Sequence, residues 1–167
     1  KIECTICSRG YYVRNDKSTC TPCDPGEYSD QNLQTSARSC KKCPQGTYSS
    51  ASGVTNITDC NKCPAGKKNE KFGSIKSSDC VDCKSNTKAE NEGSTECKVC
   101  KVGQQSDQGS AKCFDCSAGT YGDVASKSCK ACPTGWYQTL TGKTDCIKCK
   151  IGEKYVTAKD QCQSCEV

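Results

Sequence analysis

The stretch from Cys43 to Cys63, CPQGTYSSASGVTNITDCNKC, decides the fold because the rest of the chain repeats it. Gly46 stands three residues after the second cysteine of a CxxC pair, and Tyr48 stands two residues later. A run of small polar residues then leads to the next CxxC pair. Internal repetition of this kind indicates a repeat architecture, in which each unit is stabilised by its neighbours.

All 20 cysteines of the 167-residue chain fall into ten such pairs, separated by loops of 12, 16, 16, 16, 13, 12, 12, 13 and 12 residues. We therefore expect a tandem array of about nine units that is a segment of a longer chain. The expected units are residues 7–20, 23–40, 43–60, 63–80, 83–97, 100–113, 116–129, 132–146 and 149–162.

The chain is too poor in apolar residues to form a conventional core. Hydrophobic residues make up 33% of it, with two phenylalanines and one tryptophan. Burial of so little apolar surface cannot offset a conformational entropy cost of roughly 1.5 kcal/mol per ordered residue. Cross-links between cysteines must replace the core, as in other cysteine-dense chains. The sequence thus predicts a small disulfide-rich fold, an elongated repeat rod with short β-hairpins and almost no helix.

Two positions in each repeat predict its local structure. The position of Gly46 holds glycine in all the repeats but one, where Asn86 replaces it. Glycine and asparagine best tolerate a positive φ, so this position predicts a left-handed turn. The position of Tyr48 holds tyrosine, lysine or glutamine, whose rings or aliphatic stems could cover a neighbouring disulfide. Stacked repeats would then touch only their neighbours and extend on the order of 100 Å.

Two disulfide schemes fit the spacing. In a crossed scheme, adjacent CxxC pairs are joined twice, whereas in a single-loop scheme each bond closes one loop. The glycine position appears in every loop and the loop lengths do not alternate, which favours single loops. That scheme pairs Cys7 with Cys20, Cys23 with Cys40, Cys43 with Cys60, Cys63 with Cys80, Cys83 with Cys97, Cys100 with Cys113, Cys116 with Cys129, Cys132 with Cys146 and Cys149 with Cys162. It leaves Cys4 and Cys165 for bonds to flanking repeats or to other copies of the chain.

Zinc is the alternative to disulfides, because two CxxC pairs about 12 residues apart can also form a Cys4 site. Proline, which has no N–H group for a coordinating sulfur, follows Cys43, Cys63 and Cys132. This favours disulfides, and with them an oxidising exterior compartment reached through the secretory pathway. We expect no metal and no cofactor, and a multi-site zinc protein remains the second alternative function.

Catalysis and nucleic-acid binding have little support. The chain has no histidine, which removes the commonest general base. Its 24 basic and 19 acidic residues are spread along the whole sequence, whereas a nucleic-acid-binding protein would cluster its positive charge. No hydrophobic run is long enough to span a membrane. We therefore expect no enzyme, no nucleic-acid partner and no membrane segment in this chain.

A few residues are candidates for modification or contact. Asn56 begins an Asn-Ile-Thr triplet and is the expected N-glycosylation site. Tyr11, Tyr12, Trp136 and Tyr137 are the best aromatic candidates for contacts with a protein ligand, although such rings also suit a cover over disulfides.

The run from Cys43 through Tyr48 to Cys63 resembles the cysteine-rich repeat of ephrin-receptor-like modules. It is also similar to the first module of tumour-necrosis-factor-receptor cysteine-rich domains, and that similarity supports the bond between Cys43 and Cys60. Cys116 to Cys132 (CSAGTYGDVASKSCKAC) matches the same pattern. Long arrays of such repeats resemble protist cell-surface antigens and surface filament proteins.

The resemblance implies a non-enzymatic extracellular structural protein, a stiff disulfide-laddered rod in a coat, stalk or fibre at a cell surface. Its partners would be flanking repeats or copies of itself, end to end, together with attached glycans. The alternative is a receptor or adhesin ectodomain that binds a protein ligand. Fold alone does not decide between these functions.

Overall fold

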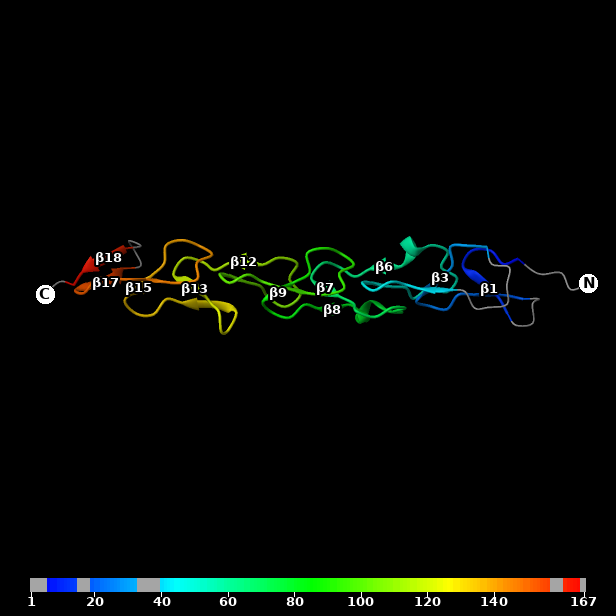
Figure 1. Ribbon diagram of the computed structural model, residues 1–167, viewed down its shortest axis with the longest axis horizontal. Coiled ribbons are helices and arrows are strands. Elements are labelled where there is room, and N and C mark those ends of the chain that lie inside the picture. Colours follow the sequence, from blue (N-terminus) through cyan, green and yellow to red (C-terminus); the bar gives the residue numbers. More distant parts are fainter. Residues whose placement is uncertain (1–5, 15–18, 33–39, 157–160, 166–167) are drawn as a thin grey trace, which may run out of the picture. The chain divides into compact units, whose positions relative to one another are not determined.

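The computed structural model describes residues 6–14, 19–32, 40–156 and 161–165 of the chain (Figure 1). Across these residues, the strands pair in nine two-stranded antiparallel sheets, and the only helices are two single turns of 3-10 helix. The strands are β1 (Tyr11–Val13), β2 (Cys20–Pro22), β3 (Glu27–Tyr28), β4 (Lys41–Lys42), β5 (Thr47–Tyr48), β6 (Asn61–Lys62), β7 (Lys67–Lys68), β8 (Val81–Asp82), β9 (Thr87–Lys88), β10 (Lys98–Val99), β11 (Gln104–Gln105), β12 (Phe114–Asp115), β13 (Thr120–Asp123), β14 (Ser128–Ala131), β15 (Trp136–Tyr137), β16 (Ile147–Lys148), β17 (Glu153–Val156) and β18 (Gln161–Ser164). The 3-10 turns are η1 (Ile57–Asp59) and η2 (Ser77–Asp79). This confirms the predicted small disulfide-rich repeat fold.

Each hairpin begins with a turn whose shape is set by the conserved spacing within the repeat. In the repeat from Cys43 to Cys60, the Thr47 N–H donates to the Pro44 carbonyl oxygen at 3.2 Å, and Gly46 has φ 78°. A positive φ at the third residue of a four-residue turn defines the type II class, which glycine fits best. Asn86 takes the same turn with φ 64°, so the predicted left-handed position is confirmed.

The two strands of each hairpin lie at fixed places in the repeat. One strand follows the turn, and the other lies between the two cysteines of the closing CxxC pair, as β5 and β6 show. Because an extended chain rises about 3.3 Å per residue, the two cysteines of a CxxC pair lie roughly 10 Å apart. A disulfide within the pair would need about 7 Å or less between the Cα atoms, so each cysteine must bond elsewhere.

The disulfides follow the single-loop scheme. Cys43 and Cys60 lie 5.9 Å apart at their Cα atoms, an ordinary distance for a disulfide. The bonds described are Cys7–Cys20, Cys23–Cys40, Cys43–Cys60, Cys63–Cys80, Cys100–Cys113, Cys116–Cys129, Cys132–Cys146 and Cys149–Cys162. Cys83 and Cys97 are also disulfide-bonded, which completes a series of nine.

The buried interior consists mainly of sulfur and small side chains. Cys7, Cys23, Cys43 and Cys63 are fully buried. In one place the interior forms an apolar cluster, where Tyr28 packs with Val54 and the Cys43–Cys60 disulfide of the next repeat. At Tyr28 the aromatic ring therefore covers a neighbouring disulfide, as the sequence predicts.

The chain divides into two compact units. One comprises Lys1–Asp82 and Ala89–Cys97, and the other comprises Cys83–Lys88 and Lys98–Val167. Within each unit the same contacts recur from repeat to repeat, and these contacts form the site described next.

Candidate functional site: the junction between repeats

Backbone hydrogen bonds join most of the described repeats to the next one. The Gly46 N–H donates to the Asn69 carbonyl oxygen at 2.8 Å, so the turn of one repeat is bonded to the strand end of the following repeat. Equivalent bonds run from Gly10 to Ser29, from Gly26 to Ser49, from Gly66 to Ala89, from Asn86 to Ser106 and from Gly119 to Gln138. The junction thus relies on backbone groups, which explains why side chains can vary between repeats.

A second series of glycines, in the loops, donates backbone hydrogen bonds to the preceding repeat. Gly73 donates its N–H to the Cys43 carbonyl oxygen at 2.9 Å, and Gly93 donates to Cys63 at 2.8 Å. The loop glycines with this bond are Gly53, Gly73, Gly93, Gly109 and Gly142, and all five have a positive φ. These glycines were not among the positions predicted from the sequence, although most follow the turn position by seven residues, a spacing that could have revealed them.

The two glycine series meet across two repeats. A Cβ atom added to Gly46 would lie 2.0 Å from the carbonyl oxygen of Gly93, which belongs to the second repeat further on. The same close approach occurs between Gly10 and Gly53, at 2.2 Å, and between Gly26 and Gly73, at 2.3 Å. In the second unit it joins Gly103 to Gly142, at 2.4 Å. The expectation that repeats touch only their neighbours is therefore wrong. Each of these contacts pairs two glycines, and because glycine has no side chain, the backbones of alternate repeats can meet.

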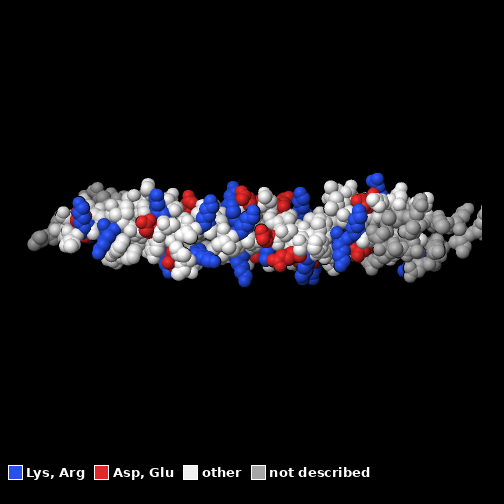
Figure 2. Space-filling view, viewed as in Figure 1, with Lys and Arg blue, Asp and Glu red and all other residues white. Residues whose placement is uncertain are grey.

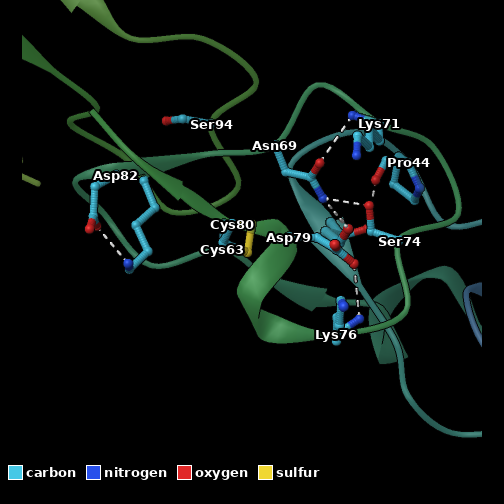
Figure 3. Close-up of a disulfide and its surroundings, with 12 residues drawn as sticks. Pro44, Cys63, Asn69, Lys71, Ser74, Lys76, Asp79, Cys80, Asp82 and Ser94 are labelled. Carbon is cyan, nitrogen blue, oxygen red and sulfur yellow. Dashed lines mark hydrogen bonds and ion pairs between the residues drawn. A yellow bond between two sulfur atoms is a disulfide. The ribbon is translucent and has the colours of Figure 1, made fainter. Parts of the chain in front are cut away.

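A buried polar side chain reinforces the junction at the Cys63–Cys80 disulfide (Figure 3). Asn69 is 2% exposed, and its Nδ2 donates to the Thr47 carbonyl oxygen at 3.1 Å and to Ser74 Oγ at 2.8 Å. Its Oδ1 accepts from the Lys71 N–H at 3.0 Å. Since a buried amide costs free energy unless its hydrogen bonds are made, this network specifies how the two repeats fit together.

Asn69 occupies a position that the sequence analysis did not single out, directly after that of Tyr48. Seven of its eight counterparts are also buried, and Tyr155 is half-buried. The buried ones are mostly small or polar: Val13, Ser29, Ser49, Ala89, Ser106, Gly122 and Gln138. Composition gives no signal here, since small polar residues are common throughout the loops. Only the alignment of the repeats on their cysteines could have revealed the position.

Charged residues form exposed pairs of opposite sign, and blue and red side chains are interspersed over the face shown in Figure 2. Lys41 Nζ lies 2.9 Å from Asp30 Oδ1, and this hydrogen bond lowers the pKa of Asp30 and raises that of Lys41. Lys130 and Asp123 pair across β13 and β14 at 2.6 Å. Hydrogen bonds from Lys130 and then from Ser126 hold the pKa of Asp123 well below its usual range. Exposed pairs of this kind contribute little stability, and they favour solubility.

The predicted aromatic contacts have different surroundings. Tyr11 and Trp136 are 39% and 38% exposed, and Lys148 Nζ lies 5.8 Å from the centre of the Trp136 ring. Tyr12 is half-buried in β1. Tyr137 is stacked on Tyr155 of the next repeat, with ring centres 5.6 Å apart. The first unit contains Tyr11 and Tyr12 and the second contains Trp136 and Tyr137, so neither unit gathers all four rings into one site.

The remaining candidates are Asn56, Cys4 and Cys165. Asn56 is exposed and precedes η1. Cys165 is exposed and carries a free thiol. Cys4 lies outside the described residues.

The described part of the second unit includes a hollow of about 150 Å³, lined by residues that include Val99, Val102 and Val124. Typical small-molecule pockets are about 300–1,000 Å³, so this hollow does not suggest a substrate site. Among the described residues, no group of three or more His, Cys, Asp or Glu side chains is placed to hold a metal ion. The cysteines of the nine disulfides cannot supply the thiolates that a Cys4 zinc site needs, and among the described cysteines only Cys165 is free. No helix in the described part of the chain is long and apolar enough to cross a membrane.

Comparison with known families agrees with this architecture. Residues 10–60 and 33–80 match the family model described as tyrosine-protein kinase ephrin type A/B receptor-like. Residues 10–80 are therefore similar to ephrin-receptor-like cysteine-rich repeats, which confirms the predicted resemblance for that part of the chain. Modules of this family are non-catalytic parts of ectodomains, and the disulfides are consistent with an extracellular location. No curated protein matches the chain.

Proposed function

We propose that the chain is a non-enzymatic structural protein outside the cell, a stiff spacer within a coat, stalk or fibre. The observation that carries this proposal is the contact between alternate repeats, exemplified by Gly46 and Gly93. Bending at one junction would have to break the hydrogen bonds between adjacent repeats and also the backbone contact between alternate repeats. Such double coupling resists bending more than contacts between nearest neighbours alone.

The interior also suits a mechanical function. Each disulfide closes a loop of about a dozen or more residues and stabilises the repeat by roughly 3 kcal/mol in the chain-entropy account. Stability is thus supplied repeat by repeat, and it does not depend on a single core that could unfold as a whole. On the face shown in Figure 2, exposed charges of both signs are interspersed, which favours solubility and offers a highly charged partner no single-sign patch there.

Small-angle X-ray scattering tests the proposed spacer. A rod on the order of 100 Å long has a radius of gyration of roughly 30 Å. A compact protein of this length would have roughly 15 Å. We expect the larger value under oxidising conditions and a change to the scattering of a disordered chain after reduction. The compact value would refute the spacer.

End-to-end association would extend the spacer. We propose that Cys165, and Cys4 near the other end of the sequence, form disulfides with flanking repeats or other copies. Each bond forms by exchange with a small-molecule disulfide outside the cell, which is reduced to two thiols. Oxidised wild-type protein should form covalent oligomers on a non-reducing gel, and Cys165→Ser should reduce them to dimers at most. Oligomers that persist in this variant would contradict the proposal.

The second candidate is a receptor or adhesin ectodomain, which the receptor-like family description and the exposed Trp136 ring favour. A labelled chain should then bind saturably to intact cells of the source, and Trp136→Ala should weaken the binding. Phe72→Ala is the matched control, because Phe72 is an exposed aromatic residue in the other unit. Equal binding by both variants would argue against a contact at Trp136.

A further inference from the structure

The Asn-Ile-Thr triplet lies at the outer edge of a loop whose two ends are buried. Val54 is 7% exposed and Cys60 is 3% exposed, whereas all five residues between them are exposed. Val54 forms a parallel bridge with Tyr28, and Cys60 is bonded to Cys43. The segment from Thr55 to Asp59 therefore projects outward from two fixed points, and a bulky group attached there would displace no packed side chain.

The side chain of Asn56 is held in a defined orientation. Asn56 has an extended backbone, with φ −143° and ψ 150°, and its Oδ1 accepts a hydrogen bond from the Thr58 N–H at 3.3 Å. The amide oxygen is thus turned toward Thr58, the residue whose hydroxyl completes the acceptor triplet. Within the described part of the chain, the Asn56 Nδ2 makes no hydrogen bond, so the nitrogen that would carry a sugar is free.

We propose that Asn56 is N-glycosylated. Its Nδ2 attacks C1 of an oligosaccharide linked to a lipid through pyrophosphate. The Nδ2–C1 bond forms, the C1–O bond to the pyrophosphate breaks, the lipid pyrophosphate leaves, and an enzymatic base takes the amide proton. The proposal rests on the extracellular location proposed above, since the transfer occurs in the secretory pathway. It also implies which edge of the repeat faces solvent in an assembly. A hydrated oligosaccharide on Asn56 would keep the edge that carries η1 in solvent and away from other copies of the chain.

The following repeat supplies a matched comparison. Lys76 precedes η2 with φ −144° and ψ 153°, nearly the backbone angles of Asn56, and Ser78 stands two residues later. Lys76→Asn therefore creates a second triplet in the same local structure. Asn61 begins the rarer Asn-Lys-Cys triplet, but Cys63 is fully buried in a disulfide and cannot serve as the hydroxyl-like third residue. We expect no sugar on Asn61.

The experiment expresses the full chain with a secretion signal in cultured eukaryotic cells and treats the secreted protein with a peptide N-glycosidase. We expect one glycan on the wild type, located at Asn56 by peptide mass spectrometry. Asn56→Gln and Thr58→Ala should carry none, Thr58→Ser should retain it, and Lys76→Asn should carry two. Each secreted variant should have the same disulfides as the wild type, which shows that it is folded.

Secreted, disulfide-bonded wild-type protein without a sugar on Asn56 overturns the proposal, whether or not Lys76→Asn becomes modified. That outcome would leave the scattering test of the spacer unaffected, so the two proposals fail separately. Conversely, a glycosylated chain with the radius of gyration of a compact protein would refute the spacer alone.

Discussion

Replacing Gly46 with alanine should separate the backbones of two alternate repeats. The added Cβ atom would lie 2.0 Å from the Gly93 carbonyl oxygen and 2.6 Å from its carbonyl carbon. An ordinary carbon–oxygen contact is roughly 3.3 Å, so the two backbones would have to separate by about 1 Å. These atoms belong to the main chain, and no side-chain rotation can relieve the overlap.

Gly135→Ala is the matched control. Gly135 has φ 79° and Gly46 has φ 78°, but a Cβ atom on Gly135 meets nothing within 4 Å. Both variants incur about 1–2 kcal/mol for alanine in a left-handed conformation. Only Gly46→Ala adds overpacking, about 1–3 kcal/mol. The loss of one backbone hydrogen bond at the displaced loop contributes about 1 kcal/mol more.

Amide hydrogen exchange by NMR measures both effects locally. The Cys63 N–H donates to the Gly46 oxygen at 2.8 Å, and the Cys149 N–H donates to the Gly135 oxygen at 2.9 Å. Exchange should accelerate about tenfold at the Cys149 amide in Gly135→Ala, since 1.4 kcal/mol is a factor of ten, and by more than that at the Cys63 amide in Gly46→Ala. In Gly46→Ala, the Gly93 amide should also exchange at least tenfold faster. If the Gly93 amide keeps its wild-type protection, the two repeats are not in contact and the reasoning is refuted.

Two further predictions concern side chains. Asn69→Leu should lower the free energy of unfolding by about 2–4 kcal/mol, because the buried Thr47 carbonyl and Ser74 hydroxyl groups lose their hydrogen-bond donor. Asn69→Ser should lower it less. Wild-type hydrogen exchange at the Gly46 amide in Asn69→Leu would contradict this prediction. The hydrogen bond with Lys130 is the main cause of the lowered pKa of Asp123. At a pH above about 3.9, the pKa of an aspartate in the unfolded chain, this pair therefore stabilises the folded hairpin fully. The stabilisation is lost as the pH falls through the lower pKa of the folded state. Carboxyl NMR titration should therefore give a higher midpoint in Lys130→Gln than in the wild type, and identical midpoints would contradict the pairing.

Much of the fold could be predicted because its determinants are local. The turn at Gly46 follows from the residue type and its place after the cysteine, and the hairpin follows from the turn. The glycine position in every loop and the loop lengths, which do not alternate, also favoured the single-loop bonds over the crossed scheme.

The junction could not be predicted in the same way. The approach of Gly46 to Gly93 depends on how far each repeat is displaced along the array, which no single repeat encodes. The importance of Asn69 depends on the same geometry, because its partners belong partly to the preceding repeat. Both residues look like ordinary loop residues until consecutive repeats are placed against each other.

The serial disulfides are the basis of the whole account, and peptide mapping without reduction tests them most directly. Trypsin can cut between the two cysteines of several CxxC pairs, because lysine lies inside them, as in Cys40-Lys41-Lys42-Cys43 and Cys60-Asn61-Lys62-Cys63. We predict a peptide that carries the Cys43–Cys60 bond and no other disulfide. A peptide that joins Cys40 to Cys60, with Cys43 joined to Cys63, would show the crossed scheme and contradict the account.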